Sequence, residues 1–156
     1  AVDLGMVESV SRRQGLHYTF FAPDELVLVT RTGGRYARTE SLTCEQLLST
    51  PLVLRENGSG TLEVISAALA AKGIRLSQLD VVMRLGTTEG IKGFVRNSDV
   101  LAIVSVTSVV DELRSGALRI IDIEGLTLSR DFNFVHAEAE PARLVRQFVD
   151  FARANR

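Results

Sequence analysis

One stretch of the chain combines glycines, hydroxyl side chains and a charged pair where an apolar run gives way to a helical pattern. It reads Arg55-Glu56-Asn57-Gly58-Ser59-Gly60-Thr61 and follows the apolar residues 51–54. A strand that turns into a helix in this way exposes unpaired backbone N–H groups at the positive end of the helix dipole, and the hydroxyls of Ser59 and Thr61 add donors. The stretch predicts a binding site for a small anion. The competing interpretation is that these residues only cap the helix.

Nucleotide-binding motifs do not fit this turn. A P-loop requires Gly-Lys-Ser/Thr and the turn has no lysine, while a dinucleotide fingerprint requires a third glycine where Glu63 stands. We therefore do not expect a nucleotide ligand. Arg55 has two interpretations, a clamp for the anion or an ion pair with Glu56 or another surface acid.

A second turn of the same type follows the next predicted strand. The strand covers residues 81–85, the turn reads Gly86-Thr87-Thr88-Glu89, and a short helix with an apolar inner face comes after it. Thr87 or Thr88 is expected to cap this helix, and Glu89 suits the dipole of its first turn. In an open parallel sheet both turns would lie at the same carboxyl edge, where ligands bind.

The elements that must position these turns alternate between strand and helix. The patterns predict strands at residues 3–7, 16–21, 25–30, 52–55, 81–85, 101–105, 118–123 and 132–136, and helices after the capping box 43–46, at 62–72, 91–95 and 109–115, and from Pro141 onward. We also expect a polar loop at residues 9–15 and a break at Pro23. The last helix should bury an apolar face made of Leu144, Val145, Phe148, Val149 and Ala152. This alternation predicts an α/β fold.

Composition limits the class of protein. The chain has 156 residues, 46% of them hydrophobic and 24% charged, as in one ordinary globular domain or two small lobes. Its net charge of −1 provides no basic footprint for nucleic acid, and no apolar stretch reaches the roughly 18 residues of a membrane span. Cys44 is the only cysteine, which excludes an internal disulfide and fits a reducing cytosol. Because the chain starts with Ala1, we expect it to be part of a longer protein.

An ordered set of short motifs runs through the chain. It comprises Asp-Leu-Gly-Met-Val-Glu at 3–8, Asp-Glu-Leu-Val-Leu-Val at 24–29, Ser-Leu-Thr at 41–43, Pro-Leu-Val-Leu-Arg-Glu-Asn-Gly-Ser-Gly-Thr at 51–61, Leu-Gly-Thr-Thr-Glu-Gly-Ile-Lys at 85–92 and Phe-Val-His at 134–136. In this order and spacing, the set closely resembles the effector-binding domain of the LysR-type bacterial transcriptional regulators. The resemblance covers essentially the whole chain.

The resemblance implies a type 2 periplasmic-binding-protein-like fold, in which two Rossmann-like α/β lobes are joined by two crossovers and a small effector binds in the cleft between them. Residues 25–123 would form regulatory lobe II. Residues 1–24 and 124–156 would form part of lobe I, whose first strand–helix units are missing here together with the helix-turn-helix DNA-binding domain. The chain also has Ser98-Asp99-Val100 where the family commonly has Gly-Leu-Gly, which leaves that turn undetermined.

The resemblance also implies a set of effector-binding residues. The matching positions are Glu8, Gly58, Ser59, Gly60, Thr61, Thr87, Thr88 and Ser105. Glu8 would sit where the strand of the terminal lobe meets the cleft, and its alternative is a solvated loop carboxylate. Ser105 would either face the cleft or cap the next turn.

The function implied is that of a cytoplasmic sensor. A small anionic metabolite would bind reversibly and alter lobe closure or the packing of a homodimer or homotetramer, and DNA would be reached only through the missing N-terminal domain. No cofactor, metal or membrane is expected. A free-standing solute-binding protein of the transport type is the alternative. An α/β enzyme fits less well, because the near-neutral bases His17 and His136 accompany no nucleophile or metal motif, and no catalytic residue is assigned.

Overall fold

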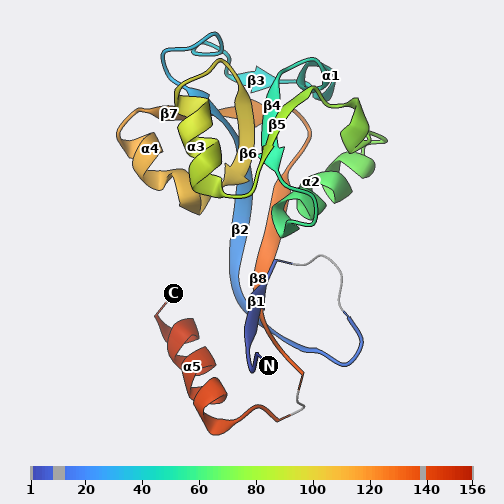
Figure 1. Cartoon of the computed structure of the whole chain (residues 1–156), viewed down its shortest axis with the longest axis vertical. Helices are drawn as coiled ribbons and strands as arrows, with labels where there is room; N and C mark the ends of the chain where they lie inside the picture. Colours follow the sequence, from blue (N-terminus) through green and yellow to red (C-terminus); the bar gives the residue numbers. More distant parts are fainter. Residues whose placement is uncertain (1, 9–12, 138–139, 156) are drawn as a thin grey trace. The chain divides into compact units, whose positions relative to one another are not determined.

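The computed structural model describes residues 2–8, 13–137 and 140–155 (Figure 1). It divides into two compact units: unit 1 comprises Ala1–Asp24 and Ser129–Arg156, and unit 2 comprises Glu25–Leu128. The chain leaves unit 1 within one strand, β2 (His17–Arg31), and returns to it at the start of another, β8 (Leu128–His136). Residues 9–12 of the predicted polar loop lie outside the described residues.

Unit 2 is built on a mixed sheet. Three of its strands are parallel, with β4 (Leu52–Arg55) between β6 (Leu101–Ser105) and β5 (Val81–Leu85). On the far side of β6, β2 runs antiparallel to both β6 and β7 (Leu118–Ile123). The short strand β3 (Ser41–Leu42), which sequence patterns did not predict, adds to β7 in parallel.

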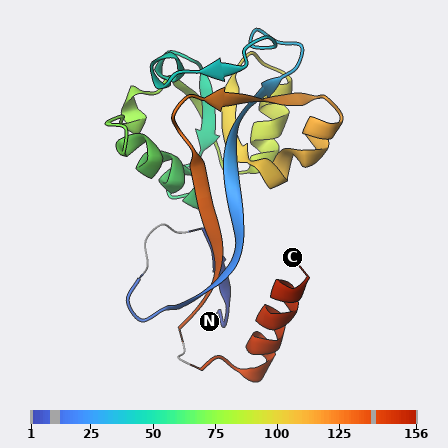
Figure 2. The ribbon, with the colours of Figure 1, turned by 180° about the vertical axis from the view of Figure 1, so that it is seen from behind.

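Helices cover both faces of this sheet, as Figure 1 and the rear view in Figure 2 show. The crossovers through α2 (Gly60–Ala70) and α3 (Thr88–Arg96) run in opposite directions across the sheet, from β4 to β5 and from β5 back to β6. Right-handed crossovers therefore place these two helices on opposite faces. The shorter helices are α1 (Cys44–Leu48), η1 (Leu76–Gln78), η2 (Val106–Val109) and α4 (Val110–Arg114).

The core follows the two-residue period of the strands. In β4, Leu52 and Leu54 are fully buried in a cluster that includes Ile65 of α2, whereas Val53 is buried in a second cluster with Ile91 of α3. Alternate side chains of a central strand point to opposite faces, so a strand covered on both faces is apolar throughout. The almost continuous apolar sequence of β4 and β6 is thereby explained.

Most local predictions for unit 2 are confirmed. The four strands predicted at residues 52–55, 81–85, 101–105 and 118–123 have these bounds. The capping box is present: the Thr43 hydroxyl accepts a hydrogen bond from the Gln46 N–H, and the Gln46 side chain accepts one from the Thr43 N–H. α2 begins at Gly60, earlier than the predicted start at Leu62.

In unit 1, β1 (Gly5–Val7) pairs antiparallel with β8, and α5 (Arg143–Ala154) follows β8. The predicted break at Pro23 is wrong, because β2 continues through it without interruption. The fixed φ of proline lies within the broad extended region, and the missing N–H matters only where a strand ladder needs it. Among the described residues, no helix is long and apolar enough to cross a membrane.

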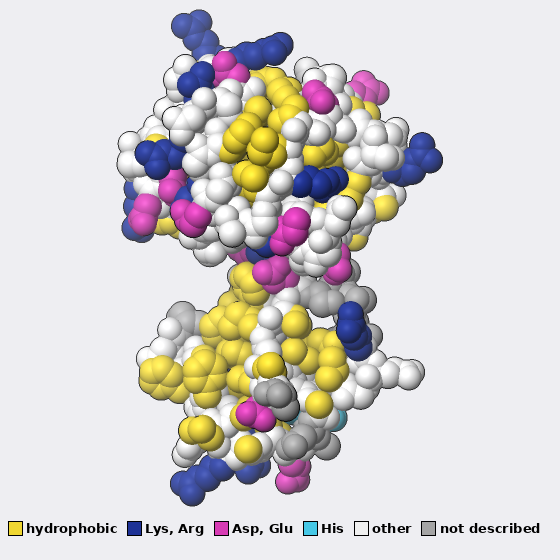
Figure 3. Space-filling model, in the orientation of Figure 1, with side chains coloured by type: hydrophobic (Ala, Val, Ile, Leu, Met, Phe, Trp, Pro, Cys, Tyr) yellow, Lys and Arg dark blue, Asp and Glu magenta, His cyan; other side chains and the backbone are white. Residues whose placement is uncertain are grey.

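The predicted burial of the α5 face is also wrong. Leu144 is 77% exposed and Phe148 is 54% exposed, while Val145, Val149 and Ala152 are only half-buried. An amphipathic pattern identifies the apolar face of a helix but not how completely it is covered; in unit 1, Phe148 makes an edge contact with Phe134. Figure 3 shows hydrophobic side chains gathered on the visible face of unit 1.

Candidate functional site

The carboxyl ends of β4, β5 and β6 lie at one edge of the unit 2 sheet. β4 pairs in parallel with β5 up to the Arg55–Leu85 pair, and β6 pairs in parallel with the other side of β4, starting at Leu52 and Leu101. A helix follows each strand at this edge: α2 after β4, α3 after β5 and η2 after β6. The two corners predicted from sequence thus share one edge, and the end of β6 adds a third corner.

The first corner connects β4 to α2. Ser59 is the N-cap residue, and its Oγ accepts a hydrogen bond from the Leu62 N–H at 3.2 Å. Gly58 before it has a φ of +87°, a backbone conformation that side chains with a Cβ rarely adopt. Ser59 and Thr61 are buried, at 8% and 6% exposure. Capping uses only an acceptor lone pair of Ser59, so its hydroxyl hydrogen remains available to donate.

The second corner connects β5 to α3. Thr87, rather than Thr88, is the N-cap, and its Oγ1 accepts from the Gly90 N–H at 3.1 Å. A Cβ on Gly90 would lie 3.0 Å from this oxygen, a tight contact that the Thr87 side chain would have to relieve by a small shift. Thr88, the first residue of α3, is half-buried. Both corners therefore combine a hydroxyl cap with a helix N-terminus.

The third corner, after β6, is held by local hydrogen bonds. The hydroxyls of Ser105 and Thr107 lie 2.8 Å apart, and the Ser108 hydroxyl donates to the Ser105 carbonyl at 2.6 Å. The Ser105 side chain makes no helix-capping bond to η2. Ser105 thus contacts the turn that follows it through its hydroxyl and its carbonyl group. It does so without the helix-capping hydrogen bond that one of its two interpretations suggested.

Lys92 ties the second corner to the third. Its ammonium group donates to Glu89 at 2.9 Å, to the Ser108 carbonyl at 3.0 Å and lies 3.0 Å from Glu112, which satisfies all three of its donors. The hydrogen bond to Glu89 is the main cause that raises the pKa of Lys92. The hydrogen bond from Lys92 likewise lowers the pKa of Glu112, whose Oε2 has no partner among the described residues. Lys92 ends the motif at residues 85–92, and no sequence pattern predicts these contacts of its side chain.

Arg55 forms an ion pair with its neighbour. Its Nε and NH2 groups donate to the two carboxylate oxygens of Glu56 at 2.7 and 2.9 Å. This hydrogen bonding is the main cause that lowers the pKa of Glu56. The sequence allows Arg55 to be either a clamp for an anion or the partner of a nearby acid, and the structure shows the ion pair with Glu56. The Arg55 carbonyl also accepts from Arg84 at 3.2 Å.

Glu8 belongs to unit 1 and is also paired. Its Oε2 accepts from Arg130 NH1 at 2.6 Å, and Arg130 Nε donates to Asp24 at 2.7 Å. The Asp24 side chain is completely buried and that of Arg130 is 4% exposed, while that of Glu8 is 32% exposed. The solvated-carboxylate alternative for Glu8 is therefore wrong, and its role toward an effector stays a prediction. No local pattern could have predicted partners so far apart in the chain.

The two histidines lie in unit 1, with ring centroids 5.5 Å apart in a stacked arrangement. Among the described residues, no group of three or more His, Cys, Asp or Glu side chains is placed to hold a metal ion.

A family model described as the LysR substrate binding domain matches residues 1–156. The chain belongs to this family. The LysR substrate-binding domain described here has the type 2 periplasmic-binding-protein-like fold, with α/β units connected by two crossovers of the chain. The prediction of family and fold class from sequence is confirmed.

Several relatives share this domain. It is 35% identical to the phosphonates import ATP-binding protein PhnC of Anaeromyxobacter dehalogenans, over 99% of this chain and 31% of that protein. It is 31% identical to the uncharacterized HTH-type transcriptional regulator Mb2303c of Mycobacterium bovis, over 94% of this chain and 48% of that protein. The chain thus spans a third to a half of the length of the curated relatives it matches.

One solved structure illustrates the shared fold. The regulatory domain of Synechocystis PCC6803 CcmR, in complex with 2-PG, superposes with a TM-score of 0.83 at 23% identity, over 98% of this chain and 73% of that chain. At this level of identity, the likeness concerns the fold of the LysR substrate-binding domain.

Proposed function

We propose that this chain is the small-molecule sensing part of a LysR-type transcriptional regulator and that it binds its effector at the carboxyl edge of the unit 2 sheet. The observation that carries the proposal is the convergence of three hydroxyl-bearing corners at that one edge. Two of these corners open helices of at least two turns, whose N-terminal N–H groups are suited to bind negative charge. Gly58, Ser59, Gly60, Thr61, Thr87, Thr88 and Ser105 are the residues assigned to this edge.

We assign an anionic effector. The support is chemical, because two helix N-termini at this edge offer backbone N–H donors and the neighbouring hydroxyls offer O–H donors. Two relatives point the same way: the CcmR regulatory domain was solved with 2-PG, and the PhnC relative is named for phosphonate import. A small phosphorus or carboxylate oxyanion is therefore the class of ligand to test first.

Unit 2 would then correspond to regulatory lobe II and unit 1 to a part of lobe I. The regulator would already sample two conformations without effector, and effector binding without turnover would change their populations. The size of this change depends on how much the affinity of the effector differs between the two conformations. The sensing event would take place in the cytoplasm, and it would alter how copies of the protein pack in a homodimer or homotetramer. DNA would be contacted by a helix-turn-helix segment outside this chain.

The test is a binding screen of the protein as its gene encodes it, with phosphate, methylphosphonate, succinate and citrate as probes. We expect one of these classes to raise the melting temperature, because a ligand at 100 times its Kd adds about 2.7 kcal/mol of stability. Calorimetry then measures Kd in two variants, Ser59→Gly and Thr88→Val. Glycine is tolerated at an N-cap at a cost of only a few tenths of a kcal/mol, so Ser59→Gly removes the hydroxyl while the helix persists.

The matched control is Ser66→Ala, which removes a hydroxyl from the middle of the same helix. We expect Ser59→Gly and Thr88→Val each to weaken binding about tenfold, the effect of a lost hydrogen bond to a charged group, and Ser66→Ala to leave Kd unchanged. Equal Kd values in all three variants would contradict the assigned edge. Chemical conversion of the bound probe by the protein would contradict the sensor.

The PhnC relative supports a second candidate, a ligand-binding domain attached to a transport ATPase. The two candidates differ in what accompanies the domain in the complete protein. Specific retention of the complete protein on DNA from its own promoter region, altered by the effector, supports the regulator. ATP hydrolysis stimulated by the effector, without DNA retention, would support the transport candidate.

A further inference from the structure

Unit 1 contains a cavity of its own, and none of its lining residues belongs to the proposed effector edge of unit 2. It has a volume of about 190 Å³ and is lined by Thr19 of β2, His136 at the end of β8, Pro141, and Arg146, Val149, Asp150 and Arg153 of α5. At roughly 30 Å³ for each water molecule, it holds about six waters. The cavity therefore suits an ion or a molecule of a few heavy atoms.

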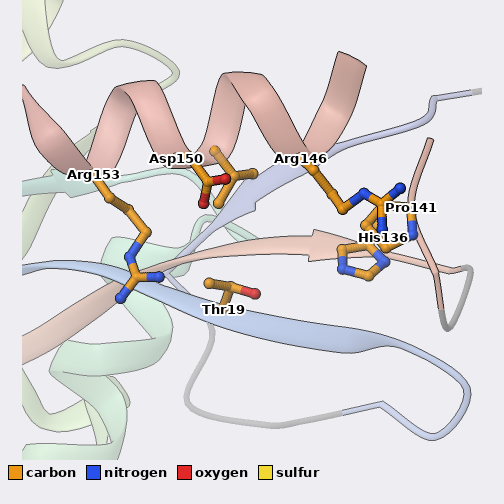
Figure 4. A pocket seen from close by; sticks show the side chains of 7 residues that line it. Thr19, His136, Pro141, Arg146, Asp150 and Arg153 are labelled. Carbon is orange, nitrogen blue, oxygen red and sulfur yellow. The ribbon is translucent and has the colours of Figure 1, made fainter. Parts of the chain in front are cut away.

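The charged residues of the cavity form one stripe of α5. Arg146, Asp150 and Arg153 recur at intervals of four and three residues, which places them on the same helix face. Figure 4 shows the Arg146 side chain extending toward His136, Arg153 extending to the other side of Thr19, and Asp150 between the two arginines. The cavity thus has a guanidinium group toward each end and a carboxylate in the middle.

The two arginines of this α5 stripe do not form ion pairs with Asp150, the aspartate between them. Arg–Asp pairs at these spacings are common on helices, yet among the described residues neither Arg146 nor Arg153 lies within ion-pair distance of Asp150 or of another carboxylate. Within the described part of unit 1, both guanidinium groups therefore lack a carboxylate partner. The two arginines and the aspartate of the lining sum to a net charge of +1.

The strand side of the cavity is polar as well. Thr19 contributes a hydroxyl group from β2, and Figure 4 shows it below Asp150. The His136 ring is stacked on His17 with an interplanar angle of 18°, which restricts the plane of the ring. Donors from two strands and a helix thus surround a space of limited volume.

We propose that this cavity binds a small oxyanion that still carries an acidic hydrogen, such as hydrogen phosphate or a monoprotonated phosphonate. Guanidinium forks match the oxygens of phosphate, and Arg146 and Arg153 would hold two of its edges. Asp150 would accept the remaining O–H of the ligand. A fully ionised oxyanion such as sulfate has no hydrogen to donate, so the Asp150 carboxylate would repel it instead.

The inference is tested by calorimetry with inorganic phosphate and with sulfate at pH 7 on the protein as its gene encodes it, carrying Ser59→Gly and Thr88→Val. This background separates the cavity from the effector edge. We expect saturable phosphate binding and at least about tenfold weaker binding of sulfate, since one lost charged hydrogen bond has this effect. Arg146→Gln and Arg153→Gln should each weaken phosphate binding by a similar factor.

Two further variants make the result decisive. Arg143→Gln, on the same helix but outside the cavity lining, should leave phosphate binding unchanged, and Asp150→Asn should remove the preference for phosphate over sulfate. Phosphate binding that survives Arg146→Gln and Arg153→Gln together would overturn the proposal. An equal loss of phosphate binding in Arg143→Gln would also overturn it. A preference for phosphate over sulfate that persists in Asp150→Asn would do the same.

Discussion

At the scale of single residues, the ammonium group of Lys92 holds two corners of the proposed effector edge together. Lys92 and Glu112 are mostly covered by their neighbours, with side chains 12% and 14% exposed. Glu89, the other carboxylate, is 80% exposed. The pair with Glu112 should therefore contribute more to stability than the pair with Glu89.

We predict that Glu112→Gln lowers the free energy of unfolding by about 1 kcal/mol at pH 7, the value of a charged hydrogen bond reduced by solvent screening. The matched change Glu89→Gln should cost less than half as much. Urea denaturation of both variants measures the difference. A larger loss of stability in Glu89→Gln than in Glu112→Gln would contradict this prediction, because the exposed ion pair of Lys92 with Glu89 would then contribute more than the covered pair with Glu112.

The pH dependence of this effect has a definite sign. Because Lys92 lowers the pKa of Glu112 in the folded state below its ordinary value of 4.5, the unfolded chain takes up the proton first as the pH falls. The stabilisation by Glu112 is therefore complete above pH 4.5 and is lost as the pH falls through the lower folded pKa. The stability difference between wild type and Glu112→Gln should shrink over the same range.

Residues whose role is local could be predicted from the sequence, whereas residues whose partners are distant could not. Capping by Ser59, one of its two interpretations, and capping of the next helix by Thr87 or Thr88 could both be read from the sequence, because a cap needs only a hydroxyl and the N–H groups that follow it. Arg130 and its partner Asp24 are separated by most of the chain and meet only once β2 and β8 have formed. Which hydroxyls contact an effector remains a prediction for the same reason, since a ligand supplies the missing partner.

At the scale of elements, the turn before α2 and the interior of α3 place opposite demands on glycine. Gly58 has a φ of +87°, whereas Gly93 lies on the exposed side of α3 with ordinary helical geometry. In both places a Cβ would meet no atom within 4 Å. The same substitution therefore tests backbone conformation alone.

We predict that Gly58→Ala destabilises the protein by about 1–2 kcal/mol, the cost of a left-handed conformation for a residue with a Cβ. Gly93→Ala should stabilise it by about 0.5–1 kcal/mol, because alanine loses less conformational freedom in a helix. Thermal or urea denaturation of each variant gives the sign. If Gly58→Ala were neutral, the turn before α2 would have to differ from the one described.

Element positions can be predicted from the sequence where the apolar period is clear, whereas a single residue such as Pro23 does not show where a strand ends. The strands of unit 2 were found because each is bounded by turn residues and covered on both faces. β2 was divided at Pro23 because proline usually interrupts a strand, and β3 was missed because two residues carry no period. The α5 pattern gave the correct helix but not its burial, which depends on what covers it.

At the scale of the whole molecule, the hydrophobic core is concentrated in unit 2. Both buried clusters consist of residues between Leu26 and Leu128, and Phe134 is the one hydrophobic residue of unit 1 that is described as buried. Unit 1 relies instead on the ion pairs of Arg130 with Glu8 and Asp24, and on the Phe132 ring under its guanidinium group at 4.9 Å. The two units should therefore respond differently to the loss of a charge.

We predict that Arg130→Met destabilises unit 1 by about 3–5 kcal/mol, because the fully buried Asp24 carboxylate loses its ion pair with Arg130. Hydrogen exchange should accelerate in β1 and β8, while β4 and β6 of unit 2 keep their protection. Arg31→Met is the matched control: it removes an arginine paired with Asp99 in unit 2, where both side chains are at least one-third exposed, and should cost at most about 1 kcal/mol. Adding Asp24→Asn to Arg130→Met should restore part of the lost protection, because the buried charge is then gone. Uniform acceleration across β4, β6 and β8 would instead mean that Arg130 stabilises the molecule as one cooperative unit.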